Sequence, residues 1–456
     1  MTPRQNAWAL FLFGLGSNLF YQIFGYIAFS EIALVVVAPA MLIFGDVEWK
    51  TSRIRIVMIL SALWLGSAIF TDYLHGTELP LAMRGAARPI FLGASMFVAY
   101  QFLRPNPRAV AWFYLGHMLS NIISMYVFKP GAIDITEQLA GINITGKFES
   151  QGIGIIQAIV PCLLIWQGSQ FPMLAGAVSA AFGLLCVFLG SRSAGGCMFV
   201  SGVAIIAAYR LLPVEAGRFR LTMRSMILLV LVGGIGVFGF SELYKTAAMK
   251  GWLGETASAK YFQQTQNRFG LLAGGRMEFV GGVLAVIDSP LIGHGSWPTD
   301  TKGFFLQATE LANADMDPGT YEYLALGVSR IPSHSQILEA WVEHGFLAVL
   351  FWWYIIWLLV RCSLRGVFSQ PDLFPAAVFL LMGKWWDMLF SPAGGRVALG
   401  FGFTFFLVLV ELCEVPAGVA QGSVCGVVEI NKHRAIGRTA RRFGRHFRGS
   451  DPRKNE

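Results

Sequence analysis

Long apolar stretches alternate with short polar segments along most of the 456-residue chain. A stretch of about 20 apolar residues is long enough to cross a bilayer as an α-helix. We expect about 12 such spans, near residues 7–24, 27–45, 54–72, 86–103, 109–128, 151–168, 170–190, 194–212, 223–241, 336–360, 373–390 and 396–413. The pattern therefore predicts an all-α polytopic membrane protein.

The composition agrees with this pattern and excludes several classes of protein. Hydrophobic residues make up 55% of the chain and charged residues 14%, whereas a soluble domain averages about 25% charged residues. An ordinary cytosolic enzyme, a disordered chain and a fibrous protein are therefore excluded. The net charge of +8 does not indicate a nucleic-acid partner, because many of the basic residues gather in the segment 432–454. The six cysteines include no Cys-x-x-Cys pair, so we expect neither a disulfide framework nor a zinc site. We also expect no cofactor.

The distribution of Lys and Arg sets the expected orientation. One side of the predicted spans carries more Lys and Arg in its short loops, and the positive-inside rule places that side, with both termini, in the cytoplasm. We then expect four regions, namely transmembrane helices in 1–241, a large, partly helical periplasmic loop in 242–335, further transmembrane helices in 336–413, and a basic cytoplasmic tail in 414–456. Within the loop, the stretches 255–267 and 277–287 have helical patterns.

The basic tail has two interpretations. Ile436, Ala440, Phe443 and Phe447 recur at helical spacing among arginines, which is typical of an amphipathic helix that lies on the lipids of an anionic inner leaflet. A solvated, disordered tail fits the same composition equally well.

Several arginines on the predicted periplasmic side are candidates for binding an anion. Arg192 follows Ser191 in a tight turn rich in Ser and Gly, whose backbone N–H groups suit an anion. Arg276 follows two glycines at a predicted helix start, where a cation is unfavourable unless an anion is bound there as well. Arg84 and Arg88 lie in the outward turn before the fourth span. They have two interpretations, either as an extension of the anion-binding site or as topology signals alone. A positional anchor at the membrane boundary is the plain alternative for Arg192.

A histidine on the same side is the candidate general base. Ser333 and Gln336 have the spacing of a capping box, so we expect Ser333 as N-cap and His334 as the first helical residue. The positive end of the helix then keeps His334 neutral near pH 7, although a lone histidine there is often structural. Glu339 and Glu343 share a helix face, and Glu339 lies about 140° round from His334, so helix-end and packing roles are the default for both.

A lysine and an aspartate within one span also have two interpretations. Lys384 and Asp387 are three residues apart in the predicted span 373–390, beside two tryptophans. We expect a structural ion pair at the outer aromatic belt, and a proton relay is the alternative.

The order of these motifs resembles the O-antigen ligase and polymerase superfamily, which includes exopolysaccharide polymerases. The resemblance covers about residues 185–365 and consists of Ser-Arg-Ser in an outward turn, Gly-Arg before a helix, Pro-x-x-Gly-x-Gly at 290–295, and His334 before a span with Glu-x-Gly. Ser335 departs from the pattern, because such proteins commonly have Asn after the histidine.

The resemblance implies a metal-independent, GT-C-like glycosyltransferase of the bacterial inner membrane. Such enzymes take the glycan from an undecaprenyl-diphosphate-linked donor on the periplasmic side and pass it to lipid A–core or to another lipid-linked repeat unit. His334 then removes the proton from the acceptor hydroxyl, Arg192 and Arg276 hold the diphosphate, and Ser191, Ser333, Glu339 and Glu343 support them. Displacement without a covalent intermediate predicts inversion at the anomeric carbon.

Two other functions remain open from the sequence. A transporter or flippase of lipid-linked or anionic sugars also needs outward arginines, but it predicts ionisable residues near the bilayer midplane and inverted repeats. A structural subunit without chemistry is the third possibility. Between ligase and polymerase the sequence does not decide.

Overall fold

The computed structural model describes residues 2–22, 26–44, 52–126, 145–188, 191–215, 218–219, 222–252, 258, 261, 277–312, 330–331, 333–391 and 396–414. The chain divides into two units, Met1–Val410 and Glu411–Glu456. The first unit contains the fold and the site. The expected basic tail lies outside the described residues apart from its first residue.

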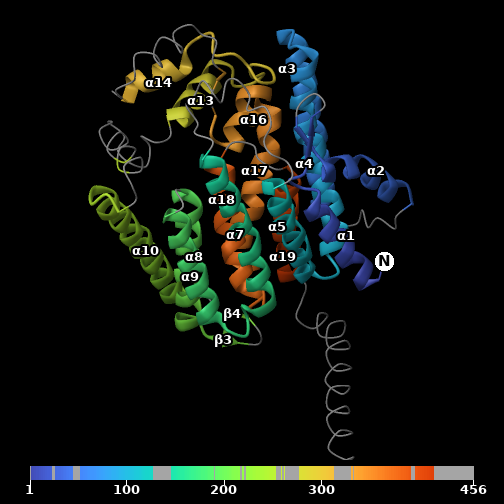
Figure 1. Cartoon of the computed structure of the whole chain (residues 1–456). Coiled ribbons are helices and arrows are strands. Elements are labelled where there is room, and N and C mark those ends of the chain that lie inside the picture. The colour runs from blue at the N-terminus through green and yellow to red at the C-terminus, as the bar shows by residue number, and fades with distance from the viewer. Residues whose placement is uncertain are drawn as a thin grey trace, which may run out of the picture. The chain divides into compact units, whose positions relative to one another are not determined.

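The described fold is almost entirely α-helical (Figure 1). Its main helices are α1 (Pro3–Leu15), α2 (Phe29–Phe44), α3 (Ser52–His75), α4 (Leu79–Leu103), α5 (Val110–Tyr126), α7 (Thr145–Gln167), α8 (Pro172–Phe188), α9 (Arg192–Leu211), α10 (Met223–Met249), α13 (Met277–Asp288), α14 (Phe304–Ala312), α16 (Gln336–His344), α17 (Phe346–Arg361), α18 (Phe374–Phe390) and α19 (Arg396–Glu414). Two short hairpins, β1 (Phe20–Gln22) with β2 (Tyr26–Ala28) and β3 (Val214–Glu215) with β4 (Arg218–Phe219), join neighbouring helices. The expected all-α class is confirmed.

Five helical segments in the described part of the chain are long and apolar enough to cross a membrane, namely Arg53–His75, Leu79–Leu103, Arg192–Leu211, Phe346–Ser369 and Arg396–Glu414. Shorter apolar helices occupy Phe29–Phe44, Ile153–Gln167 and Pro172–Val187. With these helices, the chain is an all-α membrane-spanning protein. The count of about 12 spans stays a prediction. Helix α13 confirms the helical pattern at 277–287, and the pattern at 255–267 falls almost wholly outside the described residues.

The helices share two distinguishable ends. At the first, here called the loop end, lie α13 and α14 of the segment 242–335, at the top of Figure 1. The guanidinium of Arg192, at the start of α9, lies 5.3 Å from the ring of Tyr244 near the end of α10. The Ser335 hydroxyl, just before α16, donates to the carbonyl of Met388 near the end of α18 at 3.2 Å. The starts of α9 and α16 therefore lie at the loop end.

The opposite end carries the N-terminus and the short connections. The Asn6 amide in α1 donates to the carbonyl of Phe102 near the end of α4 at 2.8 Å. The Tyr209 hydroxyl near the end of α9 donates at 2.8 Å to the carbonyl of Pro371, just before α18. The chain thus enters the first unit at this end, and α19, which begins beside the loop end, runs back toward it (Figure 1).

Glycine permits close helix contacts at several crossings. A Cβ atom on Gly14 of α1 would collide with the backbone of Phe113 in α5, and one on Gly116 of α5 would collide with the backbone of Phe11 in α1. Helices α8 and α9 approach each other in the same way where Gly183 faces Gly195. Small residues at such crossings are typical of helices packed within a membrane, where close van der Waals contact stabilises association.

Candidate functional site

The predicted span 336–360 is interrupted at the loop end. Helix α16 stops at Gly345, whose φ of 71° lies in the left-handed region that favours glycine, and α17 begins directly after it. The carbonyls of Val342 and Glu343, left without intrahelical partners, accept hydrogen bonds from the backbone N–H groups of His294 and Gly295 at 2.8 and 3.0 Å. The loop segment 290–297 therefore completes the end of α16, so the break in the helix is a fixed feature.

Two further contacts fasten this loop segment and the end of α16 to α3. The Thr71 hydroxyl donates to the carbonyl of Ile292 at 2.8 Å, and the Ser67 hydroxyl donates to the carbonyl of His344 at 2.6 Å. A Cβ on Gly85 of α4 would collide with the Ser296 hydroxyl, so only glycine lets α4 approach the segment this closely. Helices α3, α4 and α16 thus enclose the loop from different sides.

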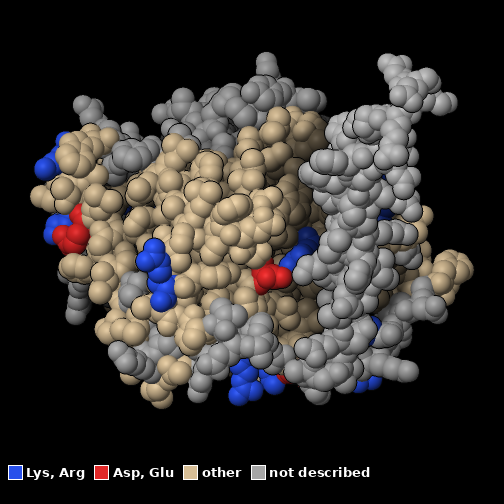
Figure 2. All heavy atoms as spheres, turned by 90° about the horizontal axis from the view of Figure 1, so that it is seen from below, with Lys and Arg blue, Asp and Glu red and all other residues tan. Residues whose placement is uncertain are grey.

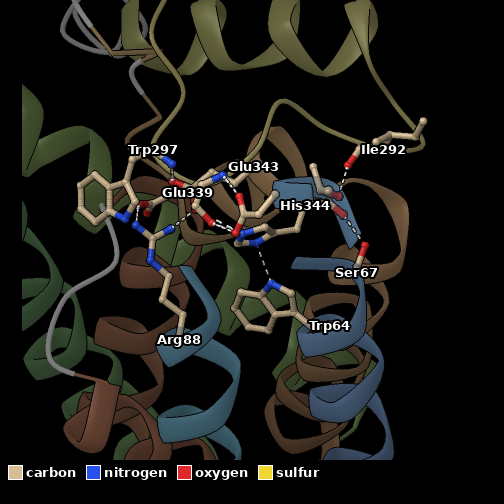
Figure 3. A network of polar contacts seen from close by, with 11 residues as sticks. Trp64, Ser67, Arg88, Ile292, Trp297, Glu339, Glu343 and His344 are labelled. Atoms are coloured by element: carbon tan, nitrogen blue, oxygen red, sulfur yellow. Dashed lines mark hydrogen bonds and ion pairs between the residues drawn. The ribbon is translucent and has the colours of Figure 1, made fainter. Parts of the chain in front are cut away.

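A buried arginine bridges α4 and α16 (Figure 3). Arg88 places Nη2 2.7 Å from Oε1 of Glu339 and Nη1 2.5 Å from Oε2 of Glu343. The second oxygen of Glu343 accepts the backbone N–H of Trp297 at 3.2 Å. Glu339 and Glu343 do share a helix face, as expected from their spacing of four residues. Both carboxyls bind the guanidinium of Arg88. The sequence predicted only helix-end and packing roles for them, not this shared ion pair.

Trp297 is held in an unusual position beside this arginine. Its φ of 57° places a bulky residue in the left-handed region, where backbone strain is expected. The guanidinium carbons of Arg88 and Arg330 lie 4.8 and 4.7 Å from its ring centroid, which gives two cation–π contacts. Together with its bond to Glu343, these contacts hold the residue in place.

The charges around Arg88 do not balance, because two carboxyls face one guanidinium. Burial raises the pKa of Glu343 to about 8, with Glu339 and Asp72 adding to the rise and Arg88 opposing it. Helix α16 precedes the membrane-spanning segment Phe346–Ser369. Around neutral pH, burial therefore favours one proton on this pair of carboxyls.

His344 is the centre of a second buried network. Its Nδ1 accepts the indole N–H of Trp64 at 3.0 Å, and its Nε2 lies 3.0 Å from the hydroxyl of Ser296. Ser296 donates its own hydroxyl and backbone N–H to the two carboxylate oxygens of Asp72 at 2.7 and 2.6 Å. Because an indole N–H only donates, Nδ1 of His344 carries no proton and Nε2–H donates to Ser296.

This geometry keeps His344 neutral. Burial, together with the nearby charge of Arg88, lowers its pKa to about 3. Both ring nitrogens are occupied, and the side chain is fully buried. His344 therefore holds the loop segment against α3 and cannot exchange a proton with a substrate without breaking the network.

His334, the candidate general base, lies two residues before α16. The expectation that Ser333 is the N-cap and His334 the first helical residue is wrong, because Ser335 caps the helix and α16 begins at Gln336. The Ser335 hydroxyl accepts the backbone N–H of Leu338 at 3.4 Å while it donates to α18, so the extra contact with α18 selects Ser335. Ser333 and His334 are both partly exposed.

The predicted anion-binding arginines have different surroundings. Arg192 is the first residue of α9, follows Ser191, and lies against Tyr244 in a partly buried position. Arg84 lies one turn before Arg88 in α4 and is also partly buried. Arg276 lies outside the described residues. Whether these arginines share a surface with His334 stays a prediction.

Two more ion pairs lie in the same unit. Glu31 of α2 is buried and receives Arg396 of α19 through two contacts, at 2.5 and 2.9 Å. Lys384 and Asp387 form the expected ion pair in α18, with Nζ 2.7 Å from Oδ2. The Glu31–Arg396 pair was not predicted from the sequence.

No protein-family model, curated protein or solved structure matches this chain. The resemblance to the ligase and polymerase superfamily therefore stays a hypothesis carried by the motifs themselves. Any functional assignment depends on which residues gather at the loop end and on the chemistry that they offer.

Proposed function

We propose that the chain is a metal-independent membrane glycosyltransferase that works at the loop end of its helices. It transfers a glycan from an undecaprenyl-diphosphate-linked donor to a saccharide acceptor, either lipid A–core or another lipid-linked repeat unit, in the bacterial inner membrane. The observation that carries this proposal is that Arg84, Arg192 and His334, far apart in sequence, all belong to segments that begin at the same end of the helices.

The chemistry assigned to these residues follows from their side chains. His334 acts as the base that removes the proton of the acceptor hydroxyl as this oxygen attacks the anomeric carbon. The diphosphate leaves with increasing negative charge, which Arg192, Arg276 and Arg84 stabilise. Arg88 was expected in this group, but its two carboxylate partners make it the residue that holds α16 in place.

The proposal needs the loop end on the periplasmic side of the membrane. The excess of basic side chains at the opposite end of the helices agrees with this orientation. Arginines at the ends of α4, α9 and α17 and in the adjoining turns lie there, namely Arg104, Arg108, Arg210, Arg361 and Arg365. Figure 2 looks at this end and shows several Lys and Arg side chains and few Asp or Glu side chains on a mostly uncharged surface. By the positive-inside rule, this distribution supports a cytoplasmic location for this end and a periplasmic location for the loop end.

The experiment that tests the proposal is an assay of the purified protein with a lipid-diphosphate-linked glycan and a saccharide acceptor. We expect glycosidic product in the presence of a metal chelator. Arg192→Ala should lower turnover about 10²–10³-fold, because it removes a group that stabilises the leaving diphosphate. Arg192→Lys keeps the charge without the planar fork and should retain part of the activity. Lys302→Ala removes an exposed loop cation paired with Asp288 and should change nothing.

One observation favours a second candidate, a transporter of lipid-linked or anionic sugars. The described part of the chain contains a buried network of ionisable groups beside a broken helix, and both are frequent at transport sites. Proteoliposomes that move the lipid-linked glycan across the bilayer and form no glycosidic product would support this candidate over the enzyme.

A further inference from the structure

Arg330 is an exposed arginine whose backbone is fixed at the loop end. It pairs with Thr299 in an antiparallel bridge, and the backbone N–H of the next residue, Ile331, donates to the carbonyl of Pro298 at 3.0 Å. The side chain of Ile331 is buried in an apolar cluster with residues of α13, α14 and α16. The chain on both sides of this bridge therefore holds Arg330 in one place.

The side chain of Arg330 is held as well, by Trp297. Its guanidinium carbon lies 4.7 Å from the centroid of the indole ring, and the guanidinium carbon of Arg88 lies 4.8 Å from the same centroid. Trp297 is bound in turn to Glu343 through its backbone N–H. An arginine side chain that is already ordered loses less conformational entropy when it binds a ligand.

The charge of Arg330 has no carboxylate partner among the described residues, and its guanidinium donates no hydrogen bond to them. Arg88, on the same ring, lies between two carboxyls, and Lys302 pairs with Asp288 at 2.6 Å. A guanidinium with unused N–H groups matches the oxygens of a phosphate, which it binds through two parallel hydrogen bonds. An anion is therefore the ligand that suits this position.

The depth of Arg330 favours an anion on the head of a lipid. Arg88, its neighbour on the indole ring, lies in the loop-end half of Leu79–Leu103, a segment long and apolar enough to cross a membrane. The proposed donor carries its diphosphate at this level, between the hydrocarbon and the water. Arg330 is also four residues before His334, the proposed base, so their Cα atoms are at most about 14 Å apart.

We propose that Arg330 binds the diphosphate of the lipid-linked donor. This inference rests on the proposed glycosyltransferase function and adds a binding residue to those expected from the sequence. The guanidinium N–H groups donate to the phosphate oxygens, and Trp297 positions the guanidinium. Arg330 takes no part in proton transfer, so its loss should weaken binding of the donor.

The test measures binding of undecaprenyl diphosphate that carries no glycan, so that no transfer can occur. Purified full-length protein in neutral detergent should bind this lipid, as measured by native mass spectrometry. Arg330→Gln should raise the Kd about 10–100-fold, as expected when hydrogen bonds to a charged group are lost. Arg330→Lys keeps the charge without the planar fork and should give an intermediate Kd. Both variants should keep the wild-type Tm, because the residue is exposed.

The matched control is Lys250→Gln. Lys250 is also an exposed cation over a tryptophan, with Nζ 4.9 Å from the ring centroid of Trp252, and its removal changes the net charge equally. This variant should bind undecaprenyl diphosphate as the wild type does. Equal losses in Lys250→Gln and Arg330→Gln would overturn the proposal, because they would show only a general attraction between charges.

Three other results would also overturn the proposal. If Arg330→Gln binds as tightly as the wild type, this inference fails and the proposed function stands, whereas a wild-type protein that binds no undecaprenyl diphosphate removes the donor that both require. If phosphatidylglycerol competes as well as the diphosphate, Arg330 is a site for anionic lipids in general. If the loss of binding in Arg330→Gln is matched by a fall in Tm, the role of Arg330 is structural.

Discussion

The two ends of helix α16 carry two histidines with opposite surroundings. His334, before the first turn, is partly exposed at the loop end, whereas His344, in the last turn, is fully buried and has both ring nitrogens engaged. The residue type is the same, but access to solvent and to hydrogen-bond partners decides which one can move a proton. The proposed glycosyltransferase would therefore have its base at the start of the helix, while the contacts of His344 anchor the loop at its end.

The sharpest way to break this comparison is to remove each histidine in turn. We expect His334→Ala to lower turnover by about 10²–10⁴-fold, the usual contribution of a general base, with little change in Tm. His344→Ala should instead lower the free energy of unfolding by about 1–3 kcal/mol, because it leaves the indole of Trp64 without an acceptor. Turnover per folded molecule and unfolding in mixed micelles measure the two effects.

The assignment fails if these effects are exchanged. A His334→Ala protein that keeps full turnover but is destabilised would make His334 the structural residue. His344→Gln offers a matched control, because a glutamine side chain retains both an acceptor and a donor and should recover part of the stability that His344→Ala loses.

The next largest effect is expected at Arg88, which holds the middle of α16. Arg88→Met leaves the buried carboxyls of Glu339 and Glu343 without their partner, and breaking such a pair costs about 3–5 kcal/mol. The triple variant with Glu339→Gln and Glu343→Gln removes the uncompensated charge and should regain much of this loss. Denaturant unfolding of the three proteins measures it, and a single variant as stable as the wild type would contradict the buried ion cluster.

The helical class of the chain could be predicted from the sequence, but the networks around α16 could not. Both successful predictions rest on local signals, since apolar length predicted the helical class and a spacing of three residues predicted the Lys384–Asp387 pair. The N-cap was misplaced because the Ser335 hydroxyl is also bound by α18, a contact between segments far apart in the chain.

The Arg88 cluster had a sequence signal that was not used. Ionisable residues inside a membrane protein usually pair with one another. Arg88 lies at the boundary of the predicted span near 86–103, and Glu339 and Glu343 face one side of the predicted span 336–360. The partners of Asp72 and His344 had no such signal, because Ser296 and Trp64 are uncharged and their contacts depend on how the loop folds back on α3.

The free energy of unfolding should also depend on pH, with a smaller effect than these substitutions, and Glu343 and His344 should shift it in opposite directions. The pKa of Glu343 is raised from 4.5 to about 8 on folding. Between these two pH values, Glu343 is protonated in the folded state and ionised in the unfolded state, so the free energy of unfolding falls as the pH rises through this window. His344 has the opposite effect, because the unfolded state binds a proton below 6.5 that the folded state refuses down to about 3, so stability falls as the pH drops.

Unfolding midpoints recorded from about pH 4 to about pH 9 should therefore pass through a maximum in mildly acidic solution. Glu343→Gln, which keeps the shape of the side chain without its titration, should flatten the alkaline side and leave the acid side unchanged. An unchanged alkaline slope in this variant would mean that Glu343 is ionised in the folded protein at neutral pH.

The smallest effect is expected at Lys384 and Asp387, where the sequence left a structural pair and a proton relay open. A partly exposed ion pair three residues apart contributes about 1 kcal/mol or less. The double variant Lys384→Gln with Asp387→Asn keeps the shape and removes both charges together, so we expect a small change in Tm and turnover equal to the wild type. A relay requires groups that exchange protons, and the double variant would then lose turnover while its Tm stays near that of the wild type. Asp387→Asn alone distinguishes the two cases further. If the pair is structural, this variant should have a lower Tm because Lys384 loses its partner. If the pair is a proton relay, the variant should have a lower turnover with little change in Tm.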